Sequence, residues 1–194
     1  MKPVGLDATL WDEPVTGIAL YVRELYWALK AQGTAVERWG AGRSGEQPRR
    51  DWSRSWWTVG RLPSLLQAER PRLYHATANF NLPLRPTPGV PYVLTVHDLV
   101  PLLLPDTVSR AFRWQFRAWL TSSLRVADAV ICVSEVTRQS LLAQFEVSPE
   151  RLTVIHHGVD HVLRDQPDRT TDAWLDSLGL KAPWVLYAGS ALRL

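Results

Sequence analysis

The sequence contains a single cysteine, Cys132, so no disulfide can form within the chain. Cys132 lies inside an apolar run, which favours a buried small side chain over a reactive thiol and indicates a reducing compartment. The amino terminus lacks the apolar stretch of a signal peptide, and no run approaches the roughly 18 apolar residues of a membrane-spanning helix. These absences predict a cytoplasmic protein that at most touches the inner face of a membrane at its periphery.

Signatures of metal and triad chemistry are missing as well. The sequence has no Asp-x-Asp triplet, no cluster with metal-ligand spacing and no Ser/His/Asp arrangement. His156 and His157 have too few acidic or thiol neighbours for a metal site and are better explained as an exit loop after a strand. We therefore expect no metal and no bound cofactor.

Lysine is scarce, since only Lys2, Lys30 and Lys181 stand among the 22 Lys plus Arg. The formal net charge is +3, a modest surplus that suits anionic small molecules or lipid headgroups. Without a recognisable binding motif, this charge argues against a nucleic-acid partner.

Apolar residues are abundant. The chain has 194 residues with 46% hydrophobic content, enough for one sizeable core and one domain with part of another. The clearest block is 127–160, where an apolar run at 129–133 precedes Ser134, a helical pattern from Glu135 and a second apolar run at 152–155. Strand, helix and strand in this spacing form the crossover unit of a parallel sheet.

The same alternation runs through most of the chain and predicts an α/β fold with a doubly wound parallel sheet, Rossmann-like in class. A long loop is expected over 40–61 and a proline-rich connection over 82–91. The other expected elements are strands at 3–8, 34–39, 72–75 and 92–97 and helices at 18–31, 63–69 and 109–126.

The end of the chain has a different pattern. A polar stretch at 164–171 reads as a linker, 172–178 as a short helix, and 184–188 as a strand that ends at Gly189. The expected division is an amino-terminal domain over 1–162, a linker with a short helix over 163–182, and at 183–194 the first strand of a further domain.

Four segments, in order, resemble glycosyltransferase family 4. They are Thr16-Gly17-Ile18-Ala19-Leu20-Tyr21 with the strand before it, Tyr74-His75-Ala76, Thr95-Val96-His97-Asp98-Leu99, and the block 127–160 with His157-Gly158-Val159-Asp160 at its end. The resemblance covers nearly the whole chain. It implies the amino-terminal, acceptor-side half of a GT-B glycosyltransferase whose second Rossmann-like domain begins near the last strand.

This resemblance implies a retaining, metal-independent enzyme. The donor would be a nucleotide sugar, with mannose favoured as the sugar. The acceptor would be a polysaccharide or a lipid-linked glycan. In such enzymes the basic residues that hold the diphosphate belong to the second domain, so the chain by itself is expected to have no turnover.

Gly17 and Ile18 follow the first expected strand. A glycine there lets backbone amides and the positive end of a helix dipole approach a phosphate, although turn geometry alone would also explain it. Ala19 and Leu20 stand where glycine is frequent in the family, which weakens the match to a phosphate-binding turn. We place Gly17 and Ile18 on the donor side.

His97 ends an expected strand at the edge where α/β sheets bind ligands. A histidine at a strand end is usually a structural hydrogen-bonding residue, but the resemblance assigns it a contact with the donor sugar, so His97 is the catalytic candidate. Asp98 either orients His97 and contacts substrate or caps the following turn.

His75, Asn79 and Asn81 follow another expected strand and are candidates for the acceptor side of the same cleft, although Asn in a proline-rich connection commonly serves turns. Ser134 could also contact ligand, yet its role as a helix cap needs no ligand.

The helix at 109–126 interleaves four aromatic residues with arginines, and the loop at 49–61 does the same. Both patterns fit a membrane interface with a lipid-linked acceptor. For the helix, aromatic packing on the sheet under arginine stems is the preferred explanation. A non-catalytic Rossmann-like module that binds a sugar or lipid is the alternative function. A dinucleotide-dependent epimerase or dehydrogenase is disfavoured because no GxGxxG follows the first strand.

Overall fold

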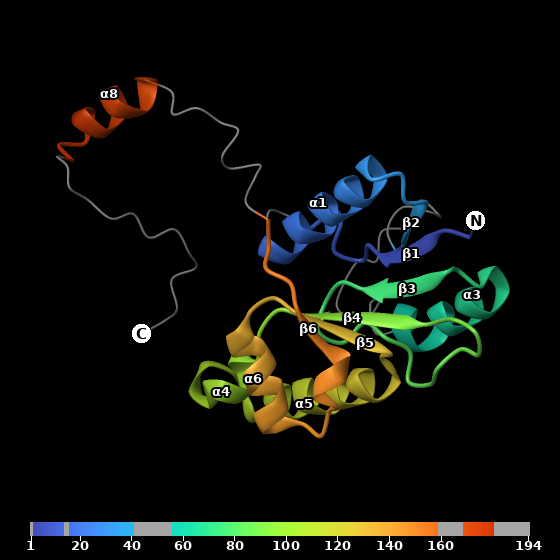
Figure 1. Ribbon diagram of the computed structural model, residues 1–194. Helices are drawn as coiled ribbons and strands as arrows, with labels where there is room; N and C mark the ends of the chain where they lie inside the picture. Colours follow the sequence, from blue (N-terminus) through green and yellow to red (C-terminus); the bar gives the residue numbers. More distant parts are fainter. Residues whose placement is uncertain (1, 14–15, 41–55, 159–168, 181–194) are drawn as a thin grey trace. The chain divides into compact units, whose positions relative to one another are not determined.

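Six parallel strands form one sheet in the order β2-β1-β3-β4-β5-β6 (Figure 1). The structure, a computed structural model, describes residues 2–13, 16–40, 56–158 and 169–180. The chain divides into two compact units, Met1–His157 and Gly158–Leu194, and the sheet belongs to the first. The strands are β1 (Val4–Asp7), β2 (Val36–Trp39), β3 (Leu73–Ala76), β4 (Tyr92–Val96), β5 (Ala129–Cys132) and β6 (Leu152–Val154).

The direction of strand addition reverses between β1 and β3. The chain crosses from β1 to β2 on one side, then returns past β1 to β3 and continues outward to β6. Right-handed crossovers that run in opposite directions place their helices on opposite faces of the sheet. Figure 1 shows α1 (Gly17–Ala31) on one face and α3 (Leu62–Glu69), α5 (Arg110–Val126) and α6 (Glu135–Gln144) on the other. The predicted doubly wound, Rossmann-like α/β fold is confirmed.

The larger part of the hydrophobic core lies between the sheet and α3, α5 and α6. Leu66, Leu120 and Leu141, one from each helix, are fully buried against the sheet. A smaller cluster on the opposite face packs Leu6 of β1 against Val22 of α1. Each buried leucine contributes about 1.5–3 kcal/mol relative to an exposed one, so both faces stabilise the sheet.

Side-chain caps fix where three helices begin. The hydroxyl oxygen of Thr16 accepts the Ala19 N–H at 3.2 Å, and the hydroxyl oxygen of Ser134 accepts the Thr137 N–H at 3.1 Å. Ser109 caps α5 in the same way. The predicted helix cap at Ser134 is confirmed. Because α1 and α6 both start at the carboxyl edge of the sheet, these caps also position the loops that form the site.

Two short helical segments differ from the sequence prediction. Trp57–Arg61 forms a π-helical turn that leads into α3, so the part of the expected loop 40–61 that the structure describes from Trp56 onward is helical. Residues 41–55, with four of the five arginines and one of the three tryptophans of that loop, lie outside the described residues. The short helix α4 (Val100–Leu103) was not predicted either. Its first turn contains Pro101, a residue that helices tolerate at this position.

In the second unit the structure describes one helix, α8 (Arg169–Ser177). A helix was predicted there at 172–178, so its existence is confirmed and its start is three residues earlier. The first predicted boundary, at 162, falls five residues after the division at His157. The expected strand at 184–188 and the whole segment 183–194 lie outside the described residues and stay predictions.

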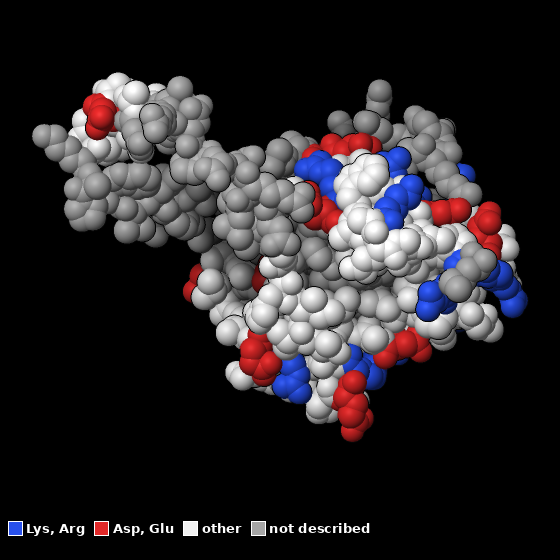
Figure 2. Space-filling view, turned by 45° about the horizontal axis from the view of Figure 1, so that its top comes forward, with Lys and Arg blue, Asp and Glu red and all other residues white. Residues whose placement is uncertain are grey.

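Charges of both signs are interspersed on the face seen in Figure 2. Lys and Arg side chains alternate there with Asp and Glu around an uncharged area. No stripe of one sign, such as a phosphate backbone would require, crosses the coloured part of this face.

A close approach of two aromatic rings to Gly5 of β1 yields a stability prediction. A Cβ at Gly5 would lie 3.2 Å from ring atoms of Trp39 and 3.3 Å from a ring atom of Tyr74, and both rings are buried. We expect Gly5→Ala to lower the free energy of unfolding by about 1–2 kcal/mol, because the packed rings must shift. Urea unfolding measures it. Gly17→Ala is the control, since a Cβ there meets no atom of a described residue within 4 Å. An equal loss in both variants would contradict the packing argument.

Candidate functional site

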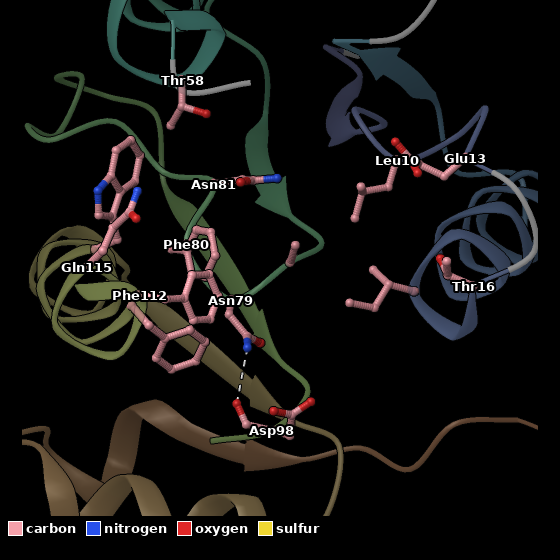
Figure 3. Close-up of a pocket in the computed structure, with 14 residues that line it drawn as sticks. Leu10, Glu13, Thr16, Thr58, Asn79, Phe80, Asn81, Asp98, Phe112 and Gln115 are labelled. Carbon is pink, nitrogen blue, oxygen red and sulfur yellow. Dashed lines mark hydrogen bonds between the residues drawn. The ribbon is translucent and has the colours of Figure 1, made fainter. Parts of the chain in front are cut away.

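A cleft of about 660 Å³ opens at the carboxyl edge of the sheet, beside the ends of β1 and β3 where the strand order reverses. Figure 3 shows its two walls: Leu10, Glu13 and Thr16 on one side, and the segment after β3 with α5 on the other. This is the place where open α/β sheets bind ligands. The aromatic and amide side chains of the second wall are Asn79, Phe80, Asn81, Phe112, Gln115, Phe116 and Trp119.

Aromatic rings give the second wall its shape. Phe80 meets Phe116 edge to face with 5.6 Å between ring centroids, and it meets Trp119 at 6.3 Å. Phe112 lies beside Phe116 at 6.3 Å. Such contacts stabilise the arrangement beyond simple burial and leave ring faces on which an apolar group or the C–H face of a sugar can pack.

The amino terminus of α1 lies at the opposite wall. Thr16 and Ile18 line the cleft, and Gly17 between them is exposed. A Cβ at Gly17 would meet no described atom within 4 Å, and its φ is not among the positive values. Neither packing nor backbone conformation therefore requires glycine at this position.

His97 follows β4 at the same edge and is half-buried. Its Nε2 lies 2.8 Å from the Thr77 carbonyl oxygen; because a carbonyl only accepts, Nε2 carries the proton. Burial lowers the pKa of His97, and the Thr77 hydrogen bond opposes that effect. A neutral ring with Nε2 protonated keeps its lone pair on Nδ1. His97 is not among the lining residues of the cleft. Its neighbour Asp98 lines the cleft, and so does Asn79, which accepts a hydrogen bond from the His97 N–H.

The rings of Tyr21, His97 and His157 form one cluster. Tyr21 of α1 contacts it edge to face at 5.1 Å between centroids, and His157 stacks on it at 5.4 Å with 25° between planes. Tyr21 and His157 are themselves 4.9 Å apart. Tyr21 stands one helical turn after Gly17, so this cluster joins the start of α1 to the end of β4. Gly17 and His97 therefore lie at one rim of the sheet, as expected.

Asn79 holds the turn that carries His97. Its Oδ1 accepts the His97 N–H at 2.8 Å, and its Nδ2 donates to the Asp98 carbonyl oxygen at 3.1 Å. The two hydrogen bonds determine which end of the Asn79 amide is oxygen and which is nitrogen, and each of the two atoms has a partner within the protein. Asn79 was predicted to bind substrate; in the structure it lines the cleft and positions His97 and Asp98.

His75 is buried beneath the cleft rather than exposed in it. Its Nε2 pairs with the hydroxyl of Thr95 at 2.8 Å, and that hydroxyl also pairs with Tyr21 at 3.0 Å. Burial lowers the pKa of His75 to about 4, with His97 as a second cause. The structure therefore keeps His75 neutral and away from the lining residues, unlike the acceptor-side placement expected from the sequence.

Asp98 and Ser134 use their side chains locally. Asp98 lines the cleft and its Oδ1 accepts the Val100 N–H at 3.0 Å, which confirms the expected cap of the following turn. Ser134 is not among the lining residues of the cleft, and its hydroxyl oxygen caps α6. Thr137, in the first turn of α6, donates to the His97 carbonyl oxygen at 3.2 Å. The start of α6 thus supports His97 from behind.

Two contributors were missed by the sequence interpretation. Asp7, the last residue of β1, is fully buried and accepts from Asn81 Nδ2 at 2.7 Å and from the Thr9 N–H at 3.0 Å. Burial raises the pKa of Asp7, and these hydrogen bonds oppose the rise. The other is Tyr21. A carboxylate at the carboxyl end of a strand was the available signal for Asp7, whereas Tyr21 reads as an ordinary helix aromatic.

Among the described residues no three His, Cys, Asp or Glu side chains gather as a metal site would require. In the same part of the chain we find no helix with the length and apolar character needed to cross a membrane.

The family model for Glycosyltransferase Family 4 matches residues 15–163, which include His97, the second wall of the cleft, and Thr16 and Ile18 of the opposite wall. The chain belongs to glycosyltransferase family 4. The predicted family is thereby confirmed. Members of this family are retaining enzymes that use a nucleotide-sugar donor and a sugar acceptor.

The chain is also similar to one curated protein and to one solved structure. The alpha-maltose-1-phosphate synthase of Mycolicibacterium smegmatis is 32% identical over 111 residues, which are 54% of this chain and 28% of that protein. A crystal structure of a glycosyltransferase from Rickettsia africae has 11% sequence identity and a TM-score of 0.40, over 93% of this chain and 50% of that one. The chain thus spans less than a third of its curated relative and half of the solved chain.

The double role of Asn79 gives a test of the site's architecture. We expect Asn79→Ala to lower the free energy of unfolding by about 1–3 kcal/mol, because the His97 N–H loses its acceptor inside the protein. Urea unfolding measures the loss. Gln115→Ala, at an exposed position of the same cleft, is the control and should stay within about 0.5 kcal/mol. Equal stability of the two variants would show that Asn79 does not hold the turn.

The lowered pKa of His75 makes stability depend on pH. The unfolded chain binds a proton at His75 below about pH 6.5, while the folded protein does so only near pH 4. The contribution is therefore fully present above pH 6.5 and falls, by about 1 kcal/mol per pH unit, as the pH drops from 6.5 towards 4. Urea unfolding at several pH values should show a shallower slope in His75→Gln. Identical slopes would contradict this burial of a neutral imidazole.

Proposed function

We propose that this chain is the acceptor-side lobe of a retaining, metal-independent glycosyltransferase that moves a sugar from a nucleotide donor to a glycan or lipid-linked acceptor. The observation that carries the proposal is the shared rim: His97 follows β4 and contacts Tyr21, one turn beyond Gly17 on α1. Donor sugar and diphosphate could lie side by side along this rim.

The chemistry asks for two stabilised charges, an oxocarbenium-like sugar and a departing diphosphate. We assign the diphosphate side to the exposed amino terminus of α1 at Gly17 and Ile18, where free backbone amides and the helix dipole favour an anion. We assign the sugar to His97, whose neutral ring offers Nδ1 as an acceptor for a sugar hydroxyl.

The acceptor is assigned to the cleft. Asp7 and Thr9 fix the amide of Asn81 by accepting from its Nδ2, which leaves the carbonyl oxygen as the group that Asn81 offers at the cleft. Asp98 supplies a carboxylate beside it, and the rings of Phe80 and Phe112 supply apolar surface. Acceptor groups that receive hydrogen bonds, combined with ring faces, suit the hydroxyls and C–H faces of a sugar.

A second lobe completes this mechanism. Among the described residues that line the cleft none is cationic, although a diphosphate leaving group without a metal needs positive charge. We therefore propose that a further α/β domain supplies those charges and that the 194-residue chain alone has no turnover. Mannose is the first donor sugar to test, because the segments Thr16-Gly17-Ile18 and His97-Asp98-Leu99 resemble those of mannose-transferring members of the family.

The decisive experiment screens nucleotide sugars for transfer by the complete gene product and compares it with His97→Ala. We expect kcat to fall by about a hundredfold or more, because one preorganised contact to the reacting sugar is lost. His156→Ala is the matched control, an exposed histidine whose Nδ1 faces the Val133 carbonyl, and should keep its rate.

Several outcomes contradict the proposal. Unaltered transfer in His97→Ala would remove its catalytic role, and an inverted anomeric centre in the product would exclude retention. Sugar transfer by the 194-residue chain alone would contradict the need for a second lobe. Tight sugar binding by the complete protein without transfer from any donor would support the alternative, a non-catalytic binding module.

A further inference from the structure

Large apolar side chains remain exposed on α4 and on the first half of α5. Trp114 is 76% exposed, the highest value for a large apolar residue in the described part of the chain, and Leu103 and Leu104 are 46% and 52% exposed. α4 packs directly against α5, so both contribute to one side of the molecule (Figure 1). The exposed apolar residues of this α4–α5 surface are Val100, Leu103, Leu104 and Trp114.

The same segment is strongly cationic. α5 has four arginines and no acidic residue, and between Val100 and Val126 the only acidic side chain is Asp106. The segment therefore carries a formal charge of +3, four arginines less one aspartate, as large as that of the whole chain. Arg117 is held by Gln144, at 2.7 Å from its side-chain oxygen. Arg110 and Arg113 form no salt bridge with a described residue.

We propose that the α4–α5 surface docks on a lipid bilayer that contains anionic lipid. A tryptophan placed at headgroup depth and leucines at the acyl boundary, with arginines next to lipid phosphates, is the composition of an interfacial helix. Each arginine near an anionic surface adds to the attraction. The proposal is independent of the proposed function, because docking requires no sugar transfer.

Other occupants fit this surface less well. In a symmetric dimer of this chain the patch would face its own copy and bring arginines against arginines with little acidic charge to compensate. A nucleic acid would use the arginines and Trp114 but would leave Leu103 and Leu104 exposed to water. A bilayer uses both the apolar and the cationic residues.

Docking would also orient the cleft. Phe112, on the flank of α5 away from Trp114, lines the cleft, and Asp98, two residues before α4, lines it as well, so both helices of the α4–α5 surface border the cleft. A lipid-linked acceptor held in the bilayer would therefore meet the cleft without leaving the membrane surface.

Co-sedimentation with large vesicles tests the proposal directly. We expect the chain to pellet with vesicles of phosphatidylcholine and phosphatidylglycerol at least about tenfold more tightly than with phosphatidylcholine alone, and to be released by high salt. The triple variant Leu103→Ser, Leu104→Ser, Trp114→Ser should lose about tenfold or more in affinity, and Arg110→Glu with Arg113→Glu a similar factor.

Matched controls keep these results specific. Trp27→Ser removes a tryptophan on α1 that is 57% exposed, and Arg85→Glu reverses an exposed arginine outside the α4–α5 surface; both should bind as the parent does. Far-UV circular dichroism verifies that each variant is folded. Failure to pellet with anionic vesicles, equal binding to neutral ones, or binding unaffected by the α4–α5 variants would overturn the proposal. So would light scattering that shows a dimer abolished by the triple variant.

Discussion

The site depends on one side chain, Asn79, which ties the end of β4 to the segment after β3. Parallel strands alone bring their carboxyl ends to one edge, but they do not determine how the loops beyond them are oriented. The two hydrogen bonds from Asn79 to the backbone of His97 and Asp98 supply that orientation. Thr137 of α6 then donates to the His97 carbonyl oxygen, and the Thr77 carbonyl oxygen accepts from Nε2. The backbone of His97 and one of its ring nitrogens are thus held, which leaves Nδ1 as the ring atom that can meet a ligand.

This arrangement uses most of the polar atoms of the rim within the protein and leaves acceptors towards the cleft. Burial lowers the pKa of both His75 and His97, so the imidazoles add no positive charge there. Asp7 is buried and engaged with Asn81. The lobe thus offers hydrogen-bond acceptors, ring faces and one helix amino terminus. Hydrogen-bond acceptors and ring faces suit a neutral sugar better than an anion, which is the reason for proposing that the charges for a diphosphate come from elsewhere.

Much of this could be predicted from the sequence, because strand–helix alternation and single capping residues are local signals. The cap at Ser134 follows from one residue before a helical pattern, and the position of His97 follows from a strand that ends there. The role of Asn79 could not be predicted, since a proline-rich connection has no periodicity that shows which way its side chains point. The sequence prediction also placed His75 in the cleft. The pattern at the end of a buried strand is the same whether a polar side chain faces a ligand or a neighbour such as Thr95.

Helix α5 joins the core, the cleft and the outer surface in one rigid element. Leu120 and Leu124 pack on the sheet, Phe112 and Phe116 line the cleft, and Trp114, two residues from Phe112, points to solvent. With about 100° of rotation per residue, Phe112 and Trp114 lie on nearly opposite flanks of the helix. A contact made by the outer flank cannot tilt α5 without also moving the rings of the cleft. A partner bound along the outer flank of this helix would therefore act first on the cleft wall that α5 forms.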